Sequence, residues 1–291
     1  MAASNHFGEP VLDELRICYV ADPLLLAELS KVEIGGYREY DPFSLFRKGG
    51  DRFEFMFALC LGEAGDREEV GLFKFGRYGA SESTYCYLNL SNHVLYDQEK
   101  MRLVLSFPDM LSLVFNNYTA MDIAIDHRKN ISSIIKRLMR NDTIKTILNG
   151  KQVNDRSKVI PGVTVDYSTS LKRLHCPTIT IRQAKASKNK DKGITIQSYD
   201  KKTEVEAGSG KQYVLDYYDN PRYLFRFEVR LNYQEMQDYC RLINTAQNID
   251  MVFDQEFLKG LYYYHLSAVL RFTKGRKKLA WPDLIDRNGR V

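Results

Sequence analysis

The sequence MDIAID, residues 121–126, predicts a β-strand with two unlike faces. Because side chains alternate across a strand, the methionine and the two isoleucines share an apolar face. Asp122 and Asp126 share the opposite face with an alanine. Isoleucines then recur at helical spacing between residues 129 and 140, so we expect this strand to run into an amphipathic helix.

Two later stretches, ITIQSYD (194–200) and LFRFEVRL (224–231), also alternate between apolar and polar side chains. Both stretches are therefore predicted to be strands, each with one apolar and one polar face. The polar faces carry Gln197, Tyr199, Arg226, Glu228 and Arg230. If the three strands share a sheet, these faces combine into one surface; otherwise they are outer faces in contact with water, as in many antiparallel sheets.

The rest of the chain places these strands in an α+β fold of mainly antiparallel sheets with packed helices. Further strands are expected at 15–20, 53–61, 71–75, 84–90, 163–167 and 178–182. Helices are expected at 97–118, where Pro108 starts a second helix, and at 129–140, 233–248 and 253–272. A basic, loop-like tail follows from Lys274. The two strand-rich parts fit two halves of one architecture, although the sequence shows no clear repeat between them.

Composition narrows the possible classes of protein. The five cysteines are scattered without a C-x-x-C pair, which argues against a disulfide scaffold or a structural zinc site. No apolar run approaches the roughly 18 residues of a membrane span. The net charge of +5 permits nucleic-acid binding, and two basic clusters could hold phosphates or could simply be solvated. They comprise Lys185, Lys188, Lys190 and Lys192, and Lys274, Arg276, Lys277 and Lys278.

The polar faces contain the groups needed for phosphoryl transfer. Carboxylate oxygens suit Mg²⁺ or Mn²⁺, which can polarise a phosphate. A tyrosine hydroxyl can attack phosphorus and form a covalent intermediate, although its ordinary pKa near 10 means that it needs help to ionise. Alternation puts Lys201 on the face of Tyr199, where it could lower that pKa or bind phosphate.

Three segments, in this order, resemble motifs of one family. Residues 122–126 (DIAID) are similar to R-x-D-x-x-x-D, residues 199–204 (YDKKTE) to Y-x-K-x-x-E, and residues 226–230 (RFEVR) to R-x-E-x-x. The chain thereby resembles, over roughly residues 50–235, the tyrosine-dependent rolling-circle initiators of filamentous phages and plasmids, and some relaxases.

The resemblance implies a DNA nickase with an HUH-endonuclease-like core. Tyr199 matches the nucleophile, and Lys201 and Glu204 match the other defined positions of its motif. The acids Asp122, Asp126 and Glu228 are then expected to hold Mg²⁺ or Mn²⁺. Contacts with DNA are expected from Arg226, Arg230 and the two basic clusters. We expect residues 1–235 to form the nicking domain, with a division into halves near 141–161, and residues 236–291 to form a helical and basic C-terminal segment.

The sequence departs from the family at two points. Ala120 stands where the family has its first arginine, and no His-hydrophobic-His metal motif is present. His127 follows Asp126 directly, but alternation points it to the other face of the strand.

The expected activity is nicking at a replication origin through a 5′-phosphotyrosine, followed by rejoining of the ends. The expected partner is single-stranded or supercoiled origin DNA, and the expected compartment is a bacterial cytoplasm. A host helicase is also expected, because the chain has no P-loop of its own with which to unwind DNA. Three alternatives stay open: a conjugative relaxase, a non-catalytic origin-binding protein, and a metal-dependent nuclease without a covalent intermediate.

Overall fold

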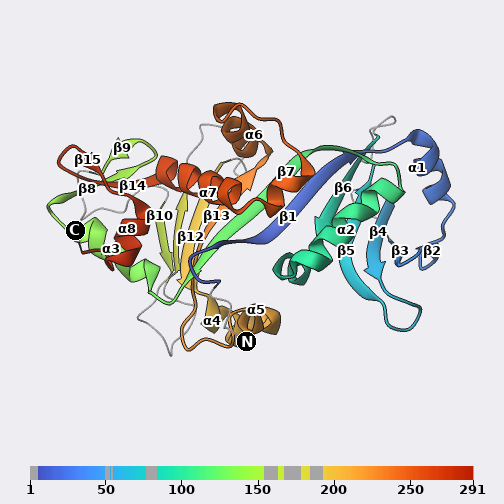
Figure 1. Cartoon of the computed structure of the whole chain (residues 1–291), viewed down its shortest axis with the longest axis horizontal. Helices are drawn as coiled ribbons and strands as arrows, with labels where there is room; N and C mark the ends of the chain where they lie inside the picture. The colour runs from blue at the N-terminus through green and yellow to red at the C-terminus, as the bar shows by residue number, and fades with distance from the viewer. Residues whose placement is uncertain are drawn as a thin grey trace. The chain divides into compact units, whose positions relative to one another are not determined.

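The computed structural model describes residues 6–49, 53, 55–76, 84–153, 163–166, 178–183 and 193–290. The chain divides into two compact units (Figure 1). Unit 1 comprises Met1–Val11, Asp122–Thr245 and Asp254–Val291, and unit 2 comprises Leu12–Met121 and Ala246–Phe253. No helix in the described ranges is long and apolar enough to cross a membrane.

Unit 2 is an antiparallel sheet with the strand order β1-β6-β5-β4-β3-β2. Helix α2 packs on this sheet through Phe107, whose ring centroid lies 4.9 Å from that of Phe43 and 5.9 Å from that of Phe73. The strands are β1 (Pro10–Val20), β2 (Tyr37–Tyr40), β3 (Phe43–Lys48), β4 (Phe55–Leu61), β5 (Glu68–Phe75) and β6 (Tyr85–Leu90). The helices are α1 (Pro23–Ser30), η1 (Asn92–Tyr96), α2 (Gln98–Met110) and η3 (Ile249–Phe253).

Unit 1 contains the three strands with polar faces, in the strand order β10-β11-β12-β13-β7. These strands are β10 (Val163–Asp166), β11 (Thr178–Arg182), β12 (Thr195–Asp200), β13 (Phe225–Asn232) and β7 (Val114–His127), of which residues 122–127 belong to unit 1. A second sheet has the order β15-β14-β8-β9, formed by β8 (Ile144–Leu148), β9 (Lys151–Gln152), β14 (Leu270–Lys274) and β15 (Lys277–Lys278).

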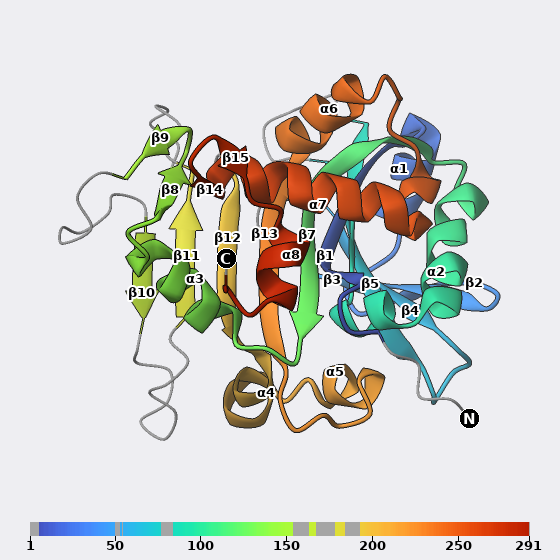
Figure 2. The ribbon, with the colours of Figure 1, turned by 60° about the vertical axis from the view of Figure 1, so that its left-hand side comes forward.

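Helices cover one face of the larger sheet of unit 1. Figure 2 shows α3 (Ile131–Arg140), α7 (Gln255–Val269) and α8 (Trp281–Asp286) over its strands. The Ser132 hydroxyl of α3 lies 2.9 Å from that of Ser198 on β12. The Tyr262 hydroxyl of α7 donates to the Phe227 carbonyl at 3.0 Å. The apolar strand residues expected from alternation therefore face the helices, and the polar residues face the other way.

The remaining helical segments of unit 1 follow the strands closely in the chain. They are α4 (Lys201–Glu204), the π-helical η2 (Val205–Ser209), α5 (Gln212–Tyr217) and α6 (Tyr233–Leu242). Figures 1 and 2 both show α4 and α5 together below the strand ends of this unit.

Sequence reasoning was wrong about one helix and about the end of another. The expected second helix after Pro108 is absent, because α2 continues to Met110, Ser112 adopts a positive φ of 53°, and β7 begins at Val114. The expected helix at 253–272 ends at Val269 and continues as β14. Short apolar runs suit either structure, and the pairing that decides β14 is with β8, far away in the chain.

The units also differ from the expected domains. Residues 141–153 contain β8 and β9 within unit 1 rather than a boundary, and residues 254–291 belong to that same unit rather than to a separate segment. The tail after Lys274 forms β15 and α8 rather than a loop.

Replacing Phe227 by alanine should destabilise unit 1 strongly. Phe227 is fully buried, and its ring lies 5.1 Å from that of Trp281 and 6.2 Å from that of Tyr262. The cavity should lower the free energy of unfolding by about 3–5 kcal/mol. Trp281 is the only tryptophan of the chain, so its fluorescence in urea reports on this unit. The control Leu242→Ala, at a residue 61% exposed, should change the value by no more than about 0.5 kcal/mol.

Candidate active site

Tyr199 lies on β12, on the sheet face opposite the helices. Strand β12 pairs with β13 so that Tyr199 stands opposite Arg226 and Gln197 stands opposite Glu228. The half-buried Tyr199 hydroxyl donates to Glu228 Oε2 at 3.0 Å. Because Glu228 is fully buried, this carboxylate holds the tyrosine in a defined position.

Arg230 contacts both Glu228, which binds Tyr199, and a second acid, Asp122. Its Nε donates to Glu228 Oε1 at 2.6 Å and lies 3.3 Å from Asp122 Oδ2 on β7. Its Nη2 donates to Gln197 Oε1 at 3.0 Å. Burial alone would lower the pKa of the Arg230 guanidinium, but the Glu228 and Asp122 carboxylates outweigh it and raise that pKa. The structure thus brings together four of the residues selected from sequence, and adds Gln197, which alternation placed on the same face.

Arg226 and Asp126 form a separate, buried ion pair. Arg226 Nε donates to Asp126 Oδ1 at 2.9 Å and Nη2 to Oδ2 at 2.6 Å, and neither side chain is exposed. Arg226 therefore cannot reach DNA in this conformation, and both Asp126 oxygens are bound by the guanidinium. We reassign this pair from DNA and metal binding to holding β7 against β13.

The N-terminal segment and α5 lie close to this pair. The Gly8 amide donates to the Asp126 carbonyl at 3.0 Å, and the His6 ring stacks on Tyr217 with centroids 4.1 Å apart. Burial, followed by the negative charge of Asp126, raises the pKa of Tyr217. Asp122, on the same face of β7, has its carboxylate beside Arg230 instead.

Lys201 and Glu204 lie next to Tyr199, but not on its strand. Strand β12 ends at Asp200, whose side chain accepts from the Thr203 amide and caps α4. Lys201 is 2% exposed, and its Nζ lies 2.9 Å from Glu204 Oε2 and 5.8 Å from the centroid of the Tyr199 ring. The expected strand alternation does not extend to Lys201, which instead packs by the tyrosine ring as an ion-paired residue.

The predicted three-carboxylate metal site is not assembled. Within the part of the chain that the structure describes, no three His, Cys, Asp or Glu side chains gather closely enough to hold a metal ion. Asp122 and Glu228 do converge, together with the amide oxygen of Gln197, on the Arg230 guanidinium. Oxygen donors of this kind suit Mg²⁺ or Mn²⁺, so these three residues fit such an ion and Asp126 does not.

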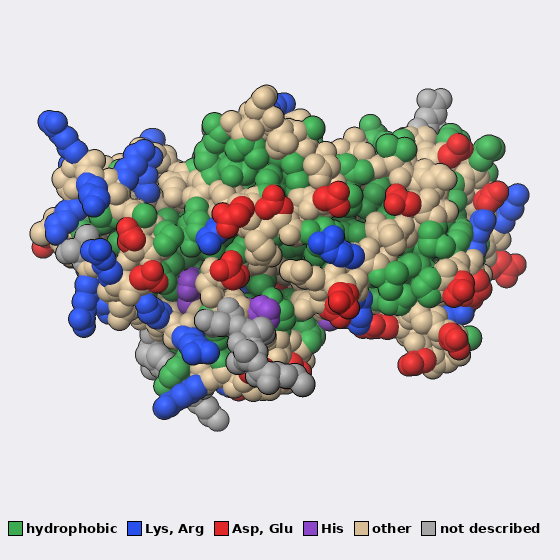
Figure 3. All heavy atoms as spheres, viewed as in Figure 1, with side chains coloured by type: hydrophobic (Ala, Val, Ile, Leu, Met, Phe, Trp, Pro, Cys, Tyr) green, Lys and Arg blue, Asp and Glu red, His purple; other side chains and the backbone are tan. Residues whose placement is uncertain are grey.

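One of the two predicted basic clusters can be located. Lys274, Arg276, Lys277 and Lys278 are exposed on and around the β14–β15 hairpin. Figure 3 shows Lys and Arg side chains close together at the left-hand end, where Figure 1 draws α3, β8, β14 and β15. The other cluster, Lys185, Lys188, Lys190 and Lys192, lies outside the described residues.

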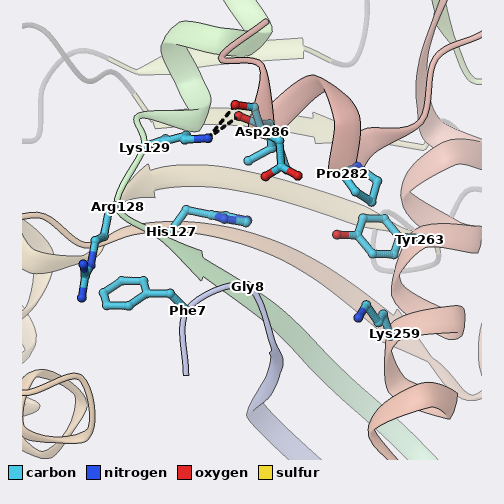
Figure 4. A pocket seen from close by; sticks show the side chains of 10 residues that line it. Phe7, Gly8, His127, Arg128, Lys129, Lys259, Tyr263, Pro282 and Asp286 are labelled. Carbon is cyan, nitrogen blue, oxygen red and sulfur yellow. Dashed lines mark hydrogen bonds between the residues drawn. The ribbon is translucent and has the colours of Figure 1, made fainter. Parts of the chain in front are cut away.

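A pocket of about 380 Å³ lies on the helix side of unit 1, and sequence reasoning missed it. Figure 4 shows His127 pointing into it from the end of β7, with Tyr263 of α7 across from it. Burial lowers the pKa of His127 to about 4, and the His127 Nε2 has no hydrogen-bond partner among the described residues. As alternation predicted, His127 faces away from Tyr199, and none of the predicted catalytic residues lines the pocket.

Asp126→Asn should test the buried ion pair. The change leaves the Arg226 guanidinium without its counter-charge, which should lower the free energy of unfolding by about 3–5 kcal/mol. The double variant Asp126→Leu/Arg226→Met should recover much of this loss, because no buried charge remains. Glu206→Gln, at an exposed residue paired with Lys202, should change stability by less than about 1 kcal/mol in the same Trp281 assay. An equally small effect of Asp126→Asn would contradict the assignment.

His127 should make unit 1 less stable in weak acid. Its folded pKa lies below the ordinary value of 6.5, so between pH 6.5 and 4 the unfolded chain binds a proton that the folded chain does not. This contribution is therefore present above pH 6.5 and is lost as the pH falls towards 4. Since His127 is partly exposed, His127→Gln should reduce the loss of stability between pH 7 and pH 5 by only about 1 kcal/mol. The control Leu242→Ala, at an exposed residue of unit 1 that does not titrate, should leave this pH dependence unchanged.

The similarity of this chain to known proteins lies in its fold and not in its sequence. The sequence matches no protein-family model and has no significant match among curated protein sequences. Among solved structures, the chain is similar to a rolling circle replication initiator protein from Geobacillus stearothermophilus, with a TM-score of 0.50 and 11% identical residues. The match covers 97% of this chain and 95% of that chain. At this identity the likeness concerns the fold: the chain has the α+β fold of a rolling circle replication initiator, which confirms the resemblance predicted from its motifs.

Proposed function

We propose that this chain initiates rolling-circle replication by nicking one strand of origin DNA with Tyr199. The observation that carries the proposal is the hydrogen bond from the Tyr199 hydroxyl to Glu228, within a cluster that also contains Asp122 and Arg230. Phosphoryl transfer needs a nucleophile whose proton a neighbouring base can accept and a cation close by to bind the phosphate. A tyrosine hydrogen-bonded to a carboxylate beside an arginine is such an arrangement. The shared fold supports the same reading.

Glu228 is placed to act as the general base. Its Oε2 already accepts the proton that Tyr199 must lose, at 3.0 Å. The tyrosine oxygen then bonds to phosphorus, while the bond from phosphorus to the 3′-oxygen breaks. That oxygen takes up a proton and becomes a free 3′-hydroxyl, and the 5′-phosphate stays on Tyr199. Attack by a 3′-hydroxyl on this phosphotyrosine reverses the step and rejoins the ends.

Arg230 and the basic hairpin are assigned to phosphates. Arg230 is the nearest described cation to the Tyr199–Glu228 pair, and its guanidinium can bind two phosphate oxygens at once. The exposed cluster from Lys274 to Lys278 can hold flanking DNA. A separate helicase would open the duplex.

A divalent cation would be held by Asp122 and Glu228, with Gln197 beside them. Such an ion supplies charge that polarises the scissile phosphate and stabilises its transition state. The buried Lys201, held by the partly exposed Glu204, packs by the tyrosine ring and limits the directions in which the hydroxyl can point.

Tyr199→Phe should abolish covalent attachment to DNA. The substrate is a single-stranded oligonucleotide with candidate origin sequence, labelled at its 3′ end, in the presence of Mn²⁺ or Mg²⁺. Wild-type protein should carry the label into a band that survives denaturing electrophoresis. Loss of the hydroxyl should lower the rate by at least about three orders of magnitude. The matched control Tyr263→Phe, on the helix side of the same unit, should keep the adduct.

Two further arms separate the roles within the site. Glu228→Gln should slow adduct formation by about 10²–10⁴-fold without moving the attachment point, and a chelator should suppress it if the metal is needed. Adduct that persists in Tyr199→Phe would transfer the nucleophile to another tyrosine. Cleavage without adduct would favour a metal nuclease, and binding without cleavage would favour a non-catalytic origin-binding protein.

A further inference from the structure

The Arg230 guanidinium occupies the space between three side-chain oxygens. Glu228 Oε1 and Asp122 Oδ2 lie 2.6 and 3.3 Å from its Nε, and Gln197 Oε1 accepts from its Nη2 at 3.0 Å. Two carboxylates and an amide oxygen are also a donor set that Mg²⁺ or Mn²⁺ prefers. The same atoms can therefore serve either the guanidinium or a metal ion.

Charge makes these two occupants exclude each other. Asp122 and Glu228 together carry two formal negative charges, and Arg230 supplies one positive charge. A divalent ion would balance both carboxylates by itself, and a guanidinium held beside it would be repelled. Binding of the metal therefore requires Arg230 to leave the carboxylates.

Arg230 is able to leave, unlike the other arginine on this face. Its side chain is 48% exposed, and one Nε is shared between two acids. Arg226, by contrast, is fully buried and binds both oxygens of Asp126 in a fork. The sheet face thus carries one fixed arginine and one that can swing into solvent while Glu228 stays in place.

We propose that Arg230 is a resident cation of the Asp122–Glu228 pair, which a divalent metal displaces and which then turns its guanidinium to the phosphate beside Tyr199. The second half of this inference rests on the proposed nicking function, whereas the displacement needs no DNA. Capture of Arg230 by a phosphate vacates the carboxylates, so phosphate and metal favour each other's binding. In the DNA-free protein, the resident arginine keeps metal affinity low.

The test is a titration of the DNA-free full chain with Mn²⁺ at pH 7.5. The electron paramagnetic resonance signal of unbound Mn²⁺ measures how much of the ion the protein has bound. Arg230→Gln should bind Mn²⁺ at least about tenfold more tightly than wild type, because no charge-assisted hydrogen bond has to break. Adding Asp122→Asn to this variant should remove the gain. The control Arg222→Gln deletes the same charge at an exposed arginine that stacks on Tyr223, and it should leave affinity unchanged within about twofold.

Melting temperatures provide a second readout and show whether each variant is folded. Saturating Mn²⁺ should raise the melting temperature of Arg230→Gln more than that of wild type, because a ligand stabilises the state that binds it. Arg230→Lys keeps the charge but loses the planar fork, so its affinity should fall between the two.

Two results would overturn the inference. One is a Mn²⁺ affinity of folded Arg230→Gln equal to or weaker than that of wild type, and the other is no Mn²⁺ binding by either protein. Neither decides whether Tyr199 nicks DNA, which is decided separately by the adduct on Tyr199; absence of Mn²⁺ binding would remove only the metal site from the proposed function. Conversely, loss of that proposal would leave a measured displacement of Arg230 by metal intact.

Discussion

The register between β12 and β13 is the constraint on which the candidate site depends. Antiparallel pairing puts Tyr199 opposite Arg226 and Thr195 opposite Arg230, yet the hydrogen bonds run diagonally. Tyr199 binds Glu228, and Arg230 binds Gln197, each two residues from its direct partner. Diagonal neighbours of this kind are within reach of long side chains. A slip of one residue would turn one strand's polar set to the helices and dismantle both contacts.

Burial divides one polar face into parts with different chemistry. Asp126 and Arg226 lie where the N-terminal segment and α5 are close, and there they neutralise each other away from water. Asp122, Glu228 and Arg230 belong to the same face, but Arg230 is about half exposed, so their pairing can exchange with a ligand. Placement of the same residue types at different depths therefore yields a structural link in one case and a reactive cluster in the other.

The sequence predicted the face of each reactive residue but not its depth. Alternation correctly placed Asp122, Tyr199 and Glu228 on one side and His127 on the other, because a period of two is a local property. It gave Asp126 and Arg226 the same status as their neighbours, because alternation does not contain contacts with other segments, such as that of the Gly8 amide with the Asp126 carbonyl. Lys201 was misjudged because the strand ends at Asp200, and the cap that Asp200 provides for α4 is a signal the sequence does contain.

Helices on the other face of the sheet hold the strand residues that precede Tyr199 and Glu228. Ser198, directly before Tyr199, is bonded to Ser132 of α3, and the carbonyl of Phe227, directly before Glu228, accepts from Tyr262 of α7. Each reactive residue thus follows a residue whose position is fixed by the helical layer. Backbone atoms held in this way keep the tyrosine and its carboxylate aligned at little entropic cost during reaction. What remains able to move is the outer part of long side chains, and on this face Arg230 combines that length with exposure to solvent.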